Sequence, residues 1–201
     1  MKTHPYQSLK VKLNNPTIAP FFSLLQKGFF IEARAGSTIK DVLCEQFQIK
    51  PQYLEDRIQT IFLDGKPVDE ADKTIVASGS TLALSAAMPG LVGSTFRRGG
   101  PLAAFRSSIT HHQDEGIAHA KGSVRAKIKL FNLLVRELGP GFLKIGILLN
   151  QKDFIDSMEN WSDSTASSIQ YVELNGRKIS NEQLDAINWS EGPEDLLLSV
   201  Q

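Results

Sequence analysis

The stretch Ile58–Val68 (IQTIFLDGKPV) recurs in a second version at Ile169–Ile179 (IQYVELNGRKI). In both, an alternating apolar run reaches an Asp-Gly or Asn-Gly pair, and a basic residue then leads into a return segment. Asp-Gly and Asn-Gly favour the two-residue turns that join antiparallel strands. Each stretch therefore predicts a β-hairpin.

The segments on either side of the hairpins recur in the same order. Lys10–Leu13 (KVKL) corresponds to Lys127–Leu130 (KIKL), and Leu82–Ser85 (LALS) corresponds to Leu196–Ser199 (LLLS). The same order of motifs seen twice indicates an internal duplication.

The duplication predicts two domains within the 201 residues. We place the first domain at residues 1–93, a Gly/Arg-rich loop and linker at 94–122, and the second domain at 123–201. In each half we expect an antiparallel first pair of strands, a helix across that pair, and a closing strand beside the opening strand of the same half. The predicted fold class is α+β with mixed sheets.

Two helix boundaries can be read from the residues. Ser37 or Thr38 can cap a helix in the first half, because their hydroxyl groups accept hydrogen bonds from the first helical N–H groups. In the second half, Phe131–Leu138 predicts a helix that Gly139 and Pro140 stop.

The composition limits the classes of function. Lys plus Arg and Asp plus Glu both number 22, so no overall field attracts nucleic acid or an anionic membrane. A single cysteine, Cys44, cannot form an internal disulfide, which suits a reducing compartment. We see no apolar signal segment and no run of the roughly 18 apolar residues that span a bilayer. The expected location is cytoplasmic.

At the level of motifs, the first half resembles the MoaD/ThiS small sulfur carriers of molybdopterin and thiamine biosynthesis, which are ubiquitin-like β-grasp proteins. The matching pieces are KVKL, GSTIKDVLCEQF, FLDGKPV and DKTIVASGSTLALSAAMPG, and the second half matches through KIKLFNLLVRELGPG, VELNGRKI and GPEDLLLSV. The resemblance covers roughly Ser8–Gly93 and Ser123–Gln201. It implies two tandem β-grasp domains.

The resemblance also places function in a glycine tail that follows the closing strand. In that family a terminal glycine carboxylate is adenylated by a partner enzyme and becomes a thiocarboxylate. Gly90 and Gly93 stand where the tail is expected, but the chain continues, and the second half ends in Val200 and Gln201. As written, neither half offers a glycine carboxylate.

The run Arg97-Arg98-Gly99-Gly100 is similar to the end of ubiquitin-like proteins. Cleavage after Gly93 or Gly100 would release a carrier, whereas an uncut run would be a flexible loop. The side chains of Arg97, Arg98 and Arg106 are also candidates for binding an anion or a nucleotide phosphate. The alternative is a solvated basic loop.

The segment around this loop is too apolar for a plain linker, so we expect it to pack on another domain or a partner. The predicted interaction surface contains Met88, Leu91, Val92, Phe96 and Phe105.

Metal and nucleophile chemistry are weakly indicated. His111, His112 and His119 match no established metal-ligand spacing, and a linker of polar residues is the favoured interpretation. Cys44 follows apolar neighbours, and the sequence places no base such as histidine near it. This favours a structural thiol. We predict no metal and no cofactor.

The leading hypothesis is therefore a non-catalytic protein-interaction or adaptor module near sulfur or cofactor metabolism. Its expected partner is a protein such as an adenylating or sulfur-transfer enzyme, with neither nucleic acid nor membrane involved. The alternatives are a sulfur carrier released by cleavage and an anion-binding protein. Self-association through sheet edges is a further possibility that the fold class raises.

Overall fold

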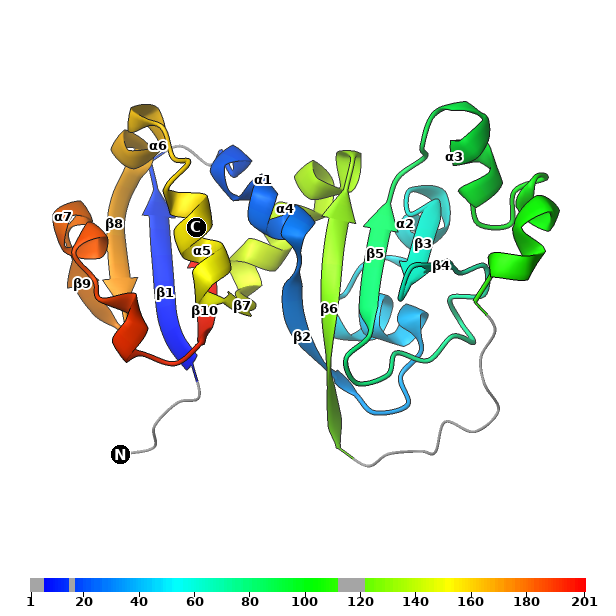
Figure 1. The fold of residues 1–201 in the computed structure, drawn as a ribbon, viewed down its shortest axis with the longest axis horizontal. Helices are drawn as coiled ribbons and strands as arrows, with labels where there is room; N and C mark the ends of the chain where they lie inside the picture. Colours follow the sequence, from blue (N-terminus) through cyan, green and yellow to red (C-terminus); the bar gives the residue numbers. More distant parts are fainter. Residues whose placement is uncertain (1–5, 15–16, 112–121) are drawn as a thin grey trace. The chain divides into compact units, whose positions relative to one another are not determined.

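The computed structural model describes residues 6–14, 17–111 and 122–201. They form an α+β protein with a ten-stranded mixed sheet (Figure 1). The chain divides into two compact units. Unit 1 takes its described residues from Met1–Phe29 and Arg136–Gln201, and unit 2 takes its described residues from Phe30–Val135.

Unit 2 holds five strands in the order β4-β3-β5-β6-β2. Their bounds are β2 (Phe29–Arg34, all but its first residue), β3 (Thr60–Leu63), β4 (Lys66–Pro67), β5 (Thr81–Ser85) and β6 (Ser123–Phe131). β3 pairs antiparallel with both β4 and β5, and β5 pairs parallel with β6.

Unit 1 holds five strands in the order β7-β10-β1-β8-β9. Their bounds are β1 (Tyr6–Leu13), β7 (Ile147–Asn150), β8 (Ile169–Leu174), β9 (Arg177–Ile179) and β10 (Asp195–Val200). β1 and β10 form a parallel central pair, and the remaining neighbours are antiparallel.

The helices are short apart from α4. Unit 1 contains η1 (Ala19–Phe21), α1 (Phe22–Lys27), α5 (Gln151–Met158), α6 (Asp163–Ser168), α7 (Asn181–Asp185), η4 (Trp189–Glu191) and most of α4 (Leu133–Ile145). Unit 2 contains the π-helical η2 (Asp41–Gln46), α2 (Pro51–Asp56), α3 (Gly90–Phe96) and the 3₁₀ helix η3 (Ala103–Ile109).

The strand pairing differs from the expectation that each half of the sequence closes on itself. The opening strand β1 pairs with β10 and β8 of the second half, and the opening strand β6 pairs with β5 of the first half. The compact units therefore do not follow the expected boundaries 1–93 and 123–201. The physical reason is that KVKL and KIKL carry the same alternation, which specifies a buried face but not a partner strand.

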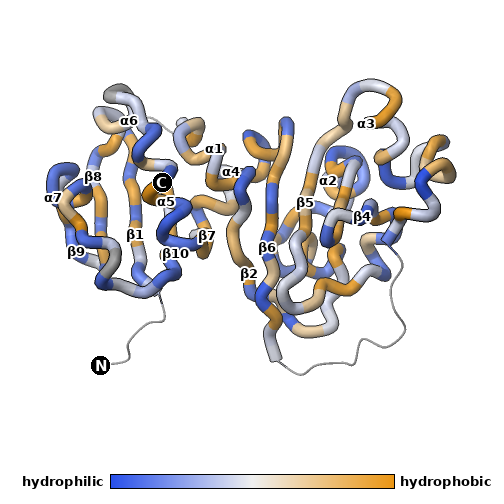
Figure 2. The backbone as a smooth tube through the Cα atoms, in the orientation of Figure 1, coloured by the Kyte–Doolittle hydropathy of each residue, from blue (hydrophilic) through white to orange (hydrophobic). Residues whose placement is uncertain are grey.

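Both opening strands send alternate side chains into a core, as expected of half-buried strands. Val11 and Ile128 occupy corresponding positions, and both are fully buried. The hydropathy colouring alternates along these strands between orange and blue (Figure 2). Lysines occupy the intervening positions on the opposite face.

The two predicted hairpins are confirmed. Asp64-Gly65 joins β3 to β4 and Asn175-Gly176 joins β8 to β9, and all four residues have positive φ. Positive φ at both central residues is the backbone of a type I′ turn, which explains the Asp-Gly and Asn-Gly pairs.

The outer strands of the two units, β4 and β9, are short. β4 spans Lys66–Pro67 and β9 spans Arg177–Ile179. Proline and basic residues on short edge strands discourage pairing with another chain. Self-association through these edges remains an untested prediction.

The predicted helix cap is confirmed at Thr38. Its hydroxyl accepts from the Asp41 N–H at 3.1 Å, and the Asp41 carboxylate accepts from the Thr38 N–H at 2.9 Å. The predicted stop at Gly139 and Pro140 is wrong, because α4 continues to Ile145. Phe142 and Leu143, beyond the proline, are buried, and this burial offsets the cost of roughly 3 kcal/mol for an interior proline.

Candidate functional site

The segment that follows β5 folds onto unit 2. It forms α3 and then η3, instead of the extended tail that the resemblance implies. The Phe96 ring packs against Phe62 of β3, with 5.2 Å between the ring centroids. The segment therefore packs on its own unit, whereas we expected packing on another domain or a partner. Packing on a partner stays a prediction.

An ion pair between a buried arginine and a half-buried aspartate fastens this segment to the loop after β4. Arg106 of η3 has a side chain only 3% exposed, and its two terminal nitrogens donate to the Asp69 carboxylate at 3.0 and 2.6 Å. Its Nε donates to the Thr95 carbonyl at 2.7 Å. Two parallel N–H···O bonds make this pair specific in geometry as well as strong. We call Asp69 and Arg106 the clamp.

Asp69 also accepts a hydrogen bond from the Gly99 N–H at 3.0 Å. Burial alone would raise the pKa of Asp69. The hydrogen bonds from Arg106 and Gly99, with the charges of Arg106 and Arg98, outweigh burial and hold that pKa below its usual value. The carboxylate therefore stays ionised, and the clamp stays charged, at neutral pH.

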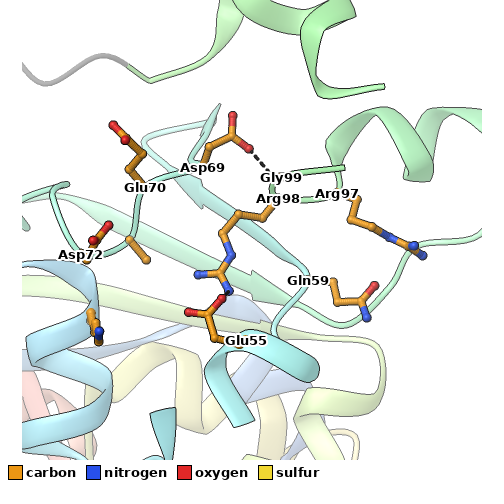
Figure 3. A pocket seen from close by; sticks show the side chains of 10 residues that line it. Glu55, Gln59, Asp69, Glu70, Asp72, Arg97, Arg98 and Gly99 are labelled. Atoms are coloured by element: carbon orange, nitrogen blue, oxygen red, sulfur yellow. Dashed lines mark hydrogen bonds and ion pairs between the residues drawn. The ribbon is translucent and has the colours of Figure 1, made fainter. Parts of the chain in front are cut away.

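A cleft of about 470 Å³ opens beside the clamp (Figure 3). Its charged lining consists of four carboxylates and three cations: Glu55, Asp69, Glu70, Asp72, Lys40, Arg97 and Arg98. The carboxylates outnumber the cations, so the cleft as a whole does not favour an anion.

The three arginines predicted to bind an anion have different environments. Arg106 belongs to the clamp, and Arg98 donates to Glu55 at 2.9 Å and to the Leu54 carbonyl at 3.0 Å. Arg97 is exposed and, in the part of the chain that the structure describes, forms no ion pair. The anion site remains a prediction, and Arg97 is the arginine available to it.

The glycines predicted as processing points lie in folded backbone. Gly90 begins α3, and Gly93 is buried within it so tightly that an added Cβ would come within 2.8 Å of three Met88 atoms. Gly99 has positive φ, and the Gly100 N–H donates to the Arg97 carbonyl at 3.1 Å. Cleavage after Gly93 would require α3 to unfold first. Cleavage after Gly100 stays a prediction.

Three of the five residues predicted to form an interaction surface are strongly exposed. Leu91 is 74% exposed, Val92 67% and Phe105 82%. Met88 and Phe96 are half-buried, and the Phe96 ring contacts Phe62. Ile109, which the sequence did not single out, is also exposed.

The remaining sequence candidates do not gather into a catalytic or metal site. His112 and His119 lie outside the described residues, and the His111 N–H donates to the Pro67 carbonyl at 2.8 Å. Within residues 6–14, 17–111 and 122–201, no three metal-binding side chains cluster together. Burial raises the pKa of the Cys44 thiol, which leaves it a poor nucleophile.

The clamp carboxylate was missed by the sequence analysis. Asp69 follows the first hairpin, 37 positions before Arg106. No local spacing rule pairs residues so far apart.

No protein family, curated protein or solved structure was found to match this chain. Within the described residues, none of the helices combines the length and the apolar character needed to cross a bilayer.

Proposed function

We propose that this chain is a non-catalytic interaction module, related to the MoaD/ThiS sulfur carriers, that binds a protein partner through exposed apolar residues of α3 and η3. The partner is an adenylating or sulfur-transfer enzyme that recognises the folded segment rather than a free glycine end.

The strand order supports a relation to the β-grasp fold. In unit 2 the parallel pair β5 and β6 lies at the centre, with the hairpin β3–β4 beyond β5 and β2 beyond β6. Unit 1 also has a central parallel pair, β1 and β10, with the hairpin β8–β9 beyond β1 and the strand β7 beyond β10. There the opening strand, rather than the closing strand, lies next to the hairpin. On this proposal each β-grasp sheet combines strands from both halves of the duplicated sequence.

The observation that carries the proposal is the exposure of Leu91, Val92 and Phe105 on a segment that the clamp holds in place. Large apolar side chains gathered on one short segment are typical of a surface that a partner covers. A segment already ordered loses less conformational entropy on binding than a flexible tail does. The clamp therefore makes this surface suited to recognition.

A site-specific crosslinking experiment tests the proposed surface. A photoreactive phenylalanine analogue replaces Phe105 in one variant and Ile145, which is 69% exposed on α4, in a matched control. Irradiation in cells of the native host is followed by identification of the adducts by mass spectrometry. We expect a discrete adduct with an adenylating or sulfur-transfer enzyme from position 105 alone, and its loss when Val92→Asp is added.

Equal adducts from positions 105 and 145 would contradict the proposal, because they would indicate random encounters. The intact mass of the protein purified from its host separates the proposal from the carrier alternative. We expect the full chain of 22.2 kDa. A species that ends at Gly93 or Gly100, with one oxygen replaced by sulfur, would instead identify a processed carrier.

A further inference from the structure

The outer face of β6 carries a stripe of cations. Arg125, Lys127 and Lys129 alternate with buried residues of the core, so all three lie on the same face of the strand. They line a shallow cleft of about 430 Å³ together with Phe30 of β2. We call these three residues the β6 stripe. It lies in unit 2, apart from the residues that carry the proposed function.

Phe30 holds two of these cations over its ring. The Arg125 guanidinium carbon lies 4.0 Å from the ring centroid, and the Lys127 ammonium nitrogen lies 4.8 Å from it. Such contacts orient a cation without neutralising its charge. They also occupy the aromatic surface on which a nucleic-acid base would stack, which disfavours single-stranded nucleic acid as the ligand.

The neighbouring strand β5 places no charge beside the two lysines of the stripe. On β5 the residues opposite Lys127 and Lys129 are Thr81 and Ala83, neither of which carries a charge. Within the described residues, neither lysine forms an ion pair. β2 adds an exposed carboxylate, Glu32, whose neighbour on that face of the strand, Arg34, is already paired with Glu45 at 3.6 Å. One carboxylate beside three cations still leaves this surface with a net positive charge.

The corresponding lysines of β1 are placed differently. Lys10 lies opposite Glu173 of β8, with 4.0 Å between the ammonium nitrogen and the carboxylate. The repeated motif thus presents a partly neutralised lysine in unit 1 and two lysines opposite uncharged residues of β5 in unit 2. This difference makes β1 a matched internal control.

We propose that the β6 stripe binds an extended acidic segment of a partner protein. Alternate residues of a strand lie roughly 6.6 Å apart, so an extended chain with a carboxylate at every second position matches the stripe. Charge complementarity of this kind sets the orientation and the rate of docking more than its affinity. The proposal is independent of the apolar surface on α3 and η3.

The test uses the full chain and a fluorescein-labelled peptide of alternating glutamate and threonine, with binding measured by fluorescence anisotropy. We expect Lys127→Glu with Lys129→Glu to weaken binding by about tenfold or more, because two attractions become repulsions. Lys10→Glu with Lys12→Glu, on the matched strand, should change it by no more than about twofold. Raising the salt concentration should weaken binding to the wild type.

Circular dichroism checks that the variants fold, and Lys127→Gln with Lys129→Gln replaces the double glutamate variant if that one does not. Three results would overturn the proposal. They are absence of peptide binding, an equal loss in the β1 variant, and tighter binding of a single-stranded oligonucleotide of the same charge, which would make the stripe a nucleic-acid surface.

Discussion

β1 and β6 begin the two halves of the chain with nearly the same four residues, yet their neighbours differ. β1 lies between β10 and β8, and β6 lies between β5 and β2. Each opening strand therefore pairs in parallel with the closing strand of the other half. The comparison teaches that the alternation of apolar and polar residues specifies which face of a strand is buried. Which strand it pairs with depends on how the whole sheet assembles.

The pairing of each opening strand with the closing strand of the other half costs little free energy. The closing strands contain LALS and LLLS, which offer similar apolar faces to either opening strand. The entropy of closing a loop grows only slowly with its length, so a pairing between distant segments costs little more than one between near segments. The backbone hydrogen bonds of β1 with the C-terminal end of the chain illustrate this, because the Leu13 N–H donates to the Gln201 carbonyl at 2.8 Å.

The largest expected effect comes from substitutions in the cores beneath β1 and β6, which test directly which strands each of them pairs with. Val11 and Ile128 are matched positions with no exposure, and a buried aspartate at either should cost at least about 3 kcal/mol. Val11→Asp should remove amide-exchange protection from β8 and β10. Ile128→Asp should remove it from β5 and β3. Hydrogen exchange read by mass spectrometry measures both.

The opposite pattern would refute the exchanged pairing. If Val11→Asp exposed β5 and β2 while β8 and β10 kept their protection, each half would fold by itself as the duplication suggests. Lys12→Asp, on the outer face of the same strand, is the control and should leave every strand protected.

The next effect compares the ion pairs of the two units. In unit 2 the arginine of the clamp is buried. In unit 1 Lys27 joins α1 to α5 through Asp153 at 2.6 Å, and the Lys27 side chain is 49% exposed. Arg106→Ala should cost roughly 2–4 kcal/mol, because it leaves a partly buried carboxylate without its partner. Lys27→Ala should cost no more than about 1 kcal/mol. Urea unfolding measures both free energies. Equal losses would show that the clamp contributes no more to the free energy of unfolding than the exposed ion pair of Lys27 does.

A smaller change in stability is expected when alanine replaces a glycine of α3 or a glycine of α4. A Cβ at Gly93 would lie 2.2 Å from the Met88 carbonyl oxygen, whereas a Cβ at Gly141 would have no atom within 4 Å. Gly93→Ala should therefore destabilise by about 1–3 kcal/mol, and Gly141→Ala should stabilise by roughly 0.5–1 kcal/mol. Thermal unfolding gives the sign of each. A stabilising Gly93→Ala would mean that α3 is not held against Met88.

The sequence predicted what local residues determine. The turns at Asp64-Gly65 and Asn175-Gly176 and the cap at Thr38 follow from backbone requirements within a few residues, and the structure has all three. The exchange of β1 and β6 escaped prediction because two equivalent pairings satisfy the same pattern. The interior Pro140 of α4 escaped it because buried residues beyond the proline decide where that helix ends.

The candidate site also has features that follow from local residues and features that depend on distant ones. The apolar character of a glycine-rich segment singled out Leu91, Val92 and Phe105 as part of an interaction surface, and the structure leaves these three side chains exposed. The clamp was not, because it joins Asp69 to a residue 37 positions away. Pairing of that kind depends on the packed positions of β4 and η3, which no local pattern reports.

The smallest expected effect is the dependence of the clamp on pH. The folded state holds the pKa of Asp69 below the value of about 3.9 that an unfolded aspartate has. The ionised carboxylate therefore contributes its stabilisation above that unfolded pKa, and the contribution is lost as the pH falls through the lower, folded value. Solvent screening keeps the effect modest, because the Asp69 side chain is 31% exposed.

Limited proteolysis of the α3–η3 segment, followed as the pH is lowered with an acid-stable protease, measures this loss. Cleavage within the segment should increase below about pH 4, before unit 1 loses its protection. In Asp69→Asn the segment should already be cleaved faster at neutral pH, and its susceptibility should change less on acidification. If the wild-type segment kept constant protection across that range while unit 1 opened, the ionised clamp would not be what holds the segment in place.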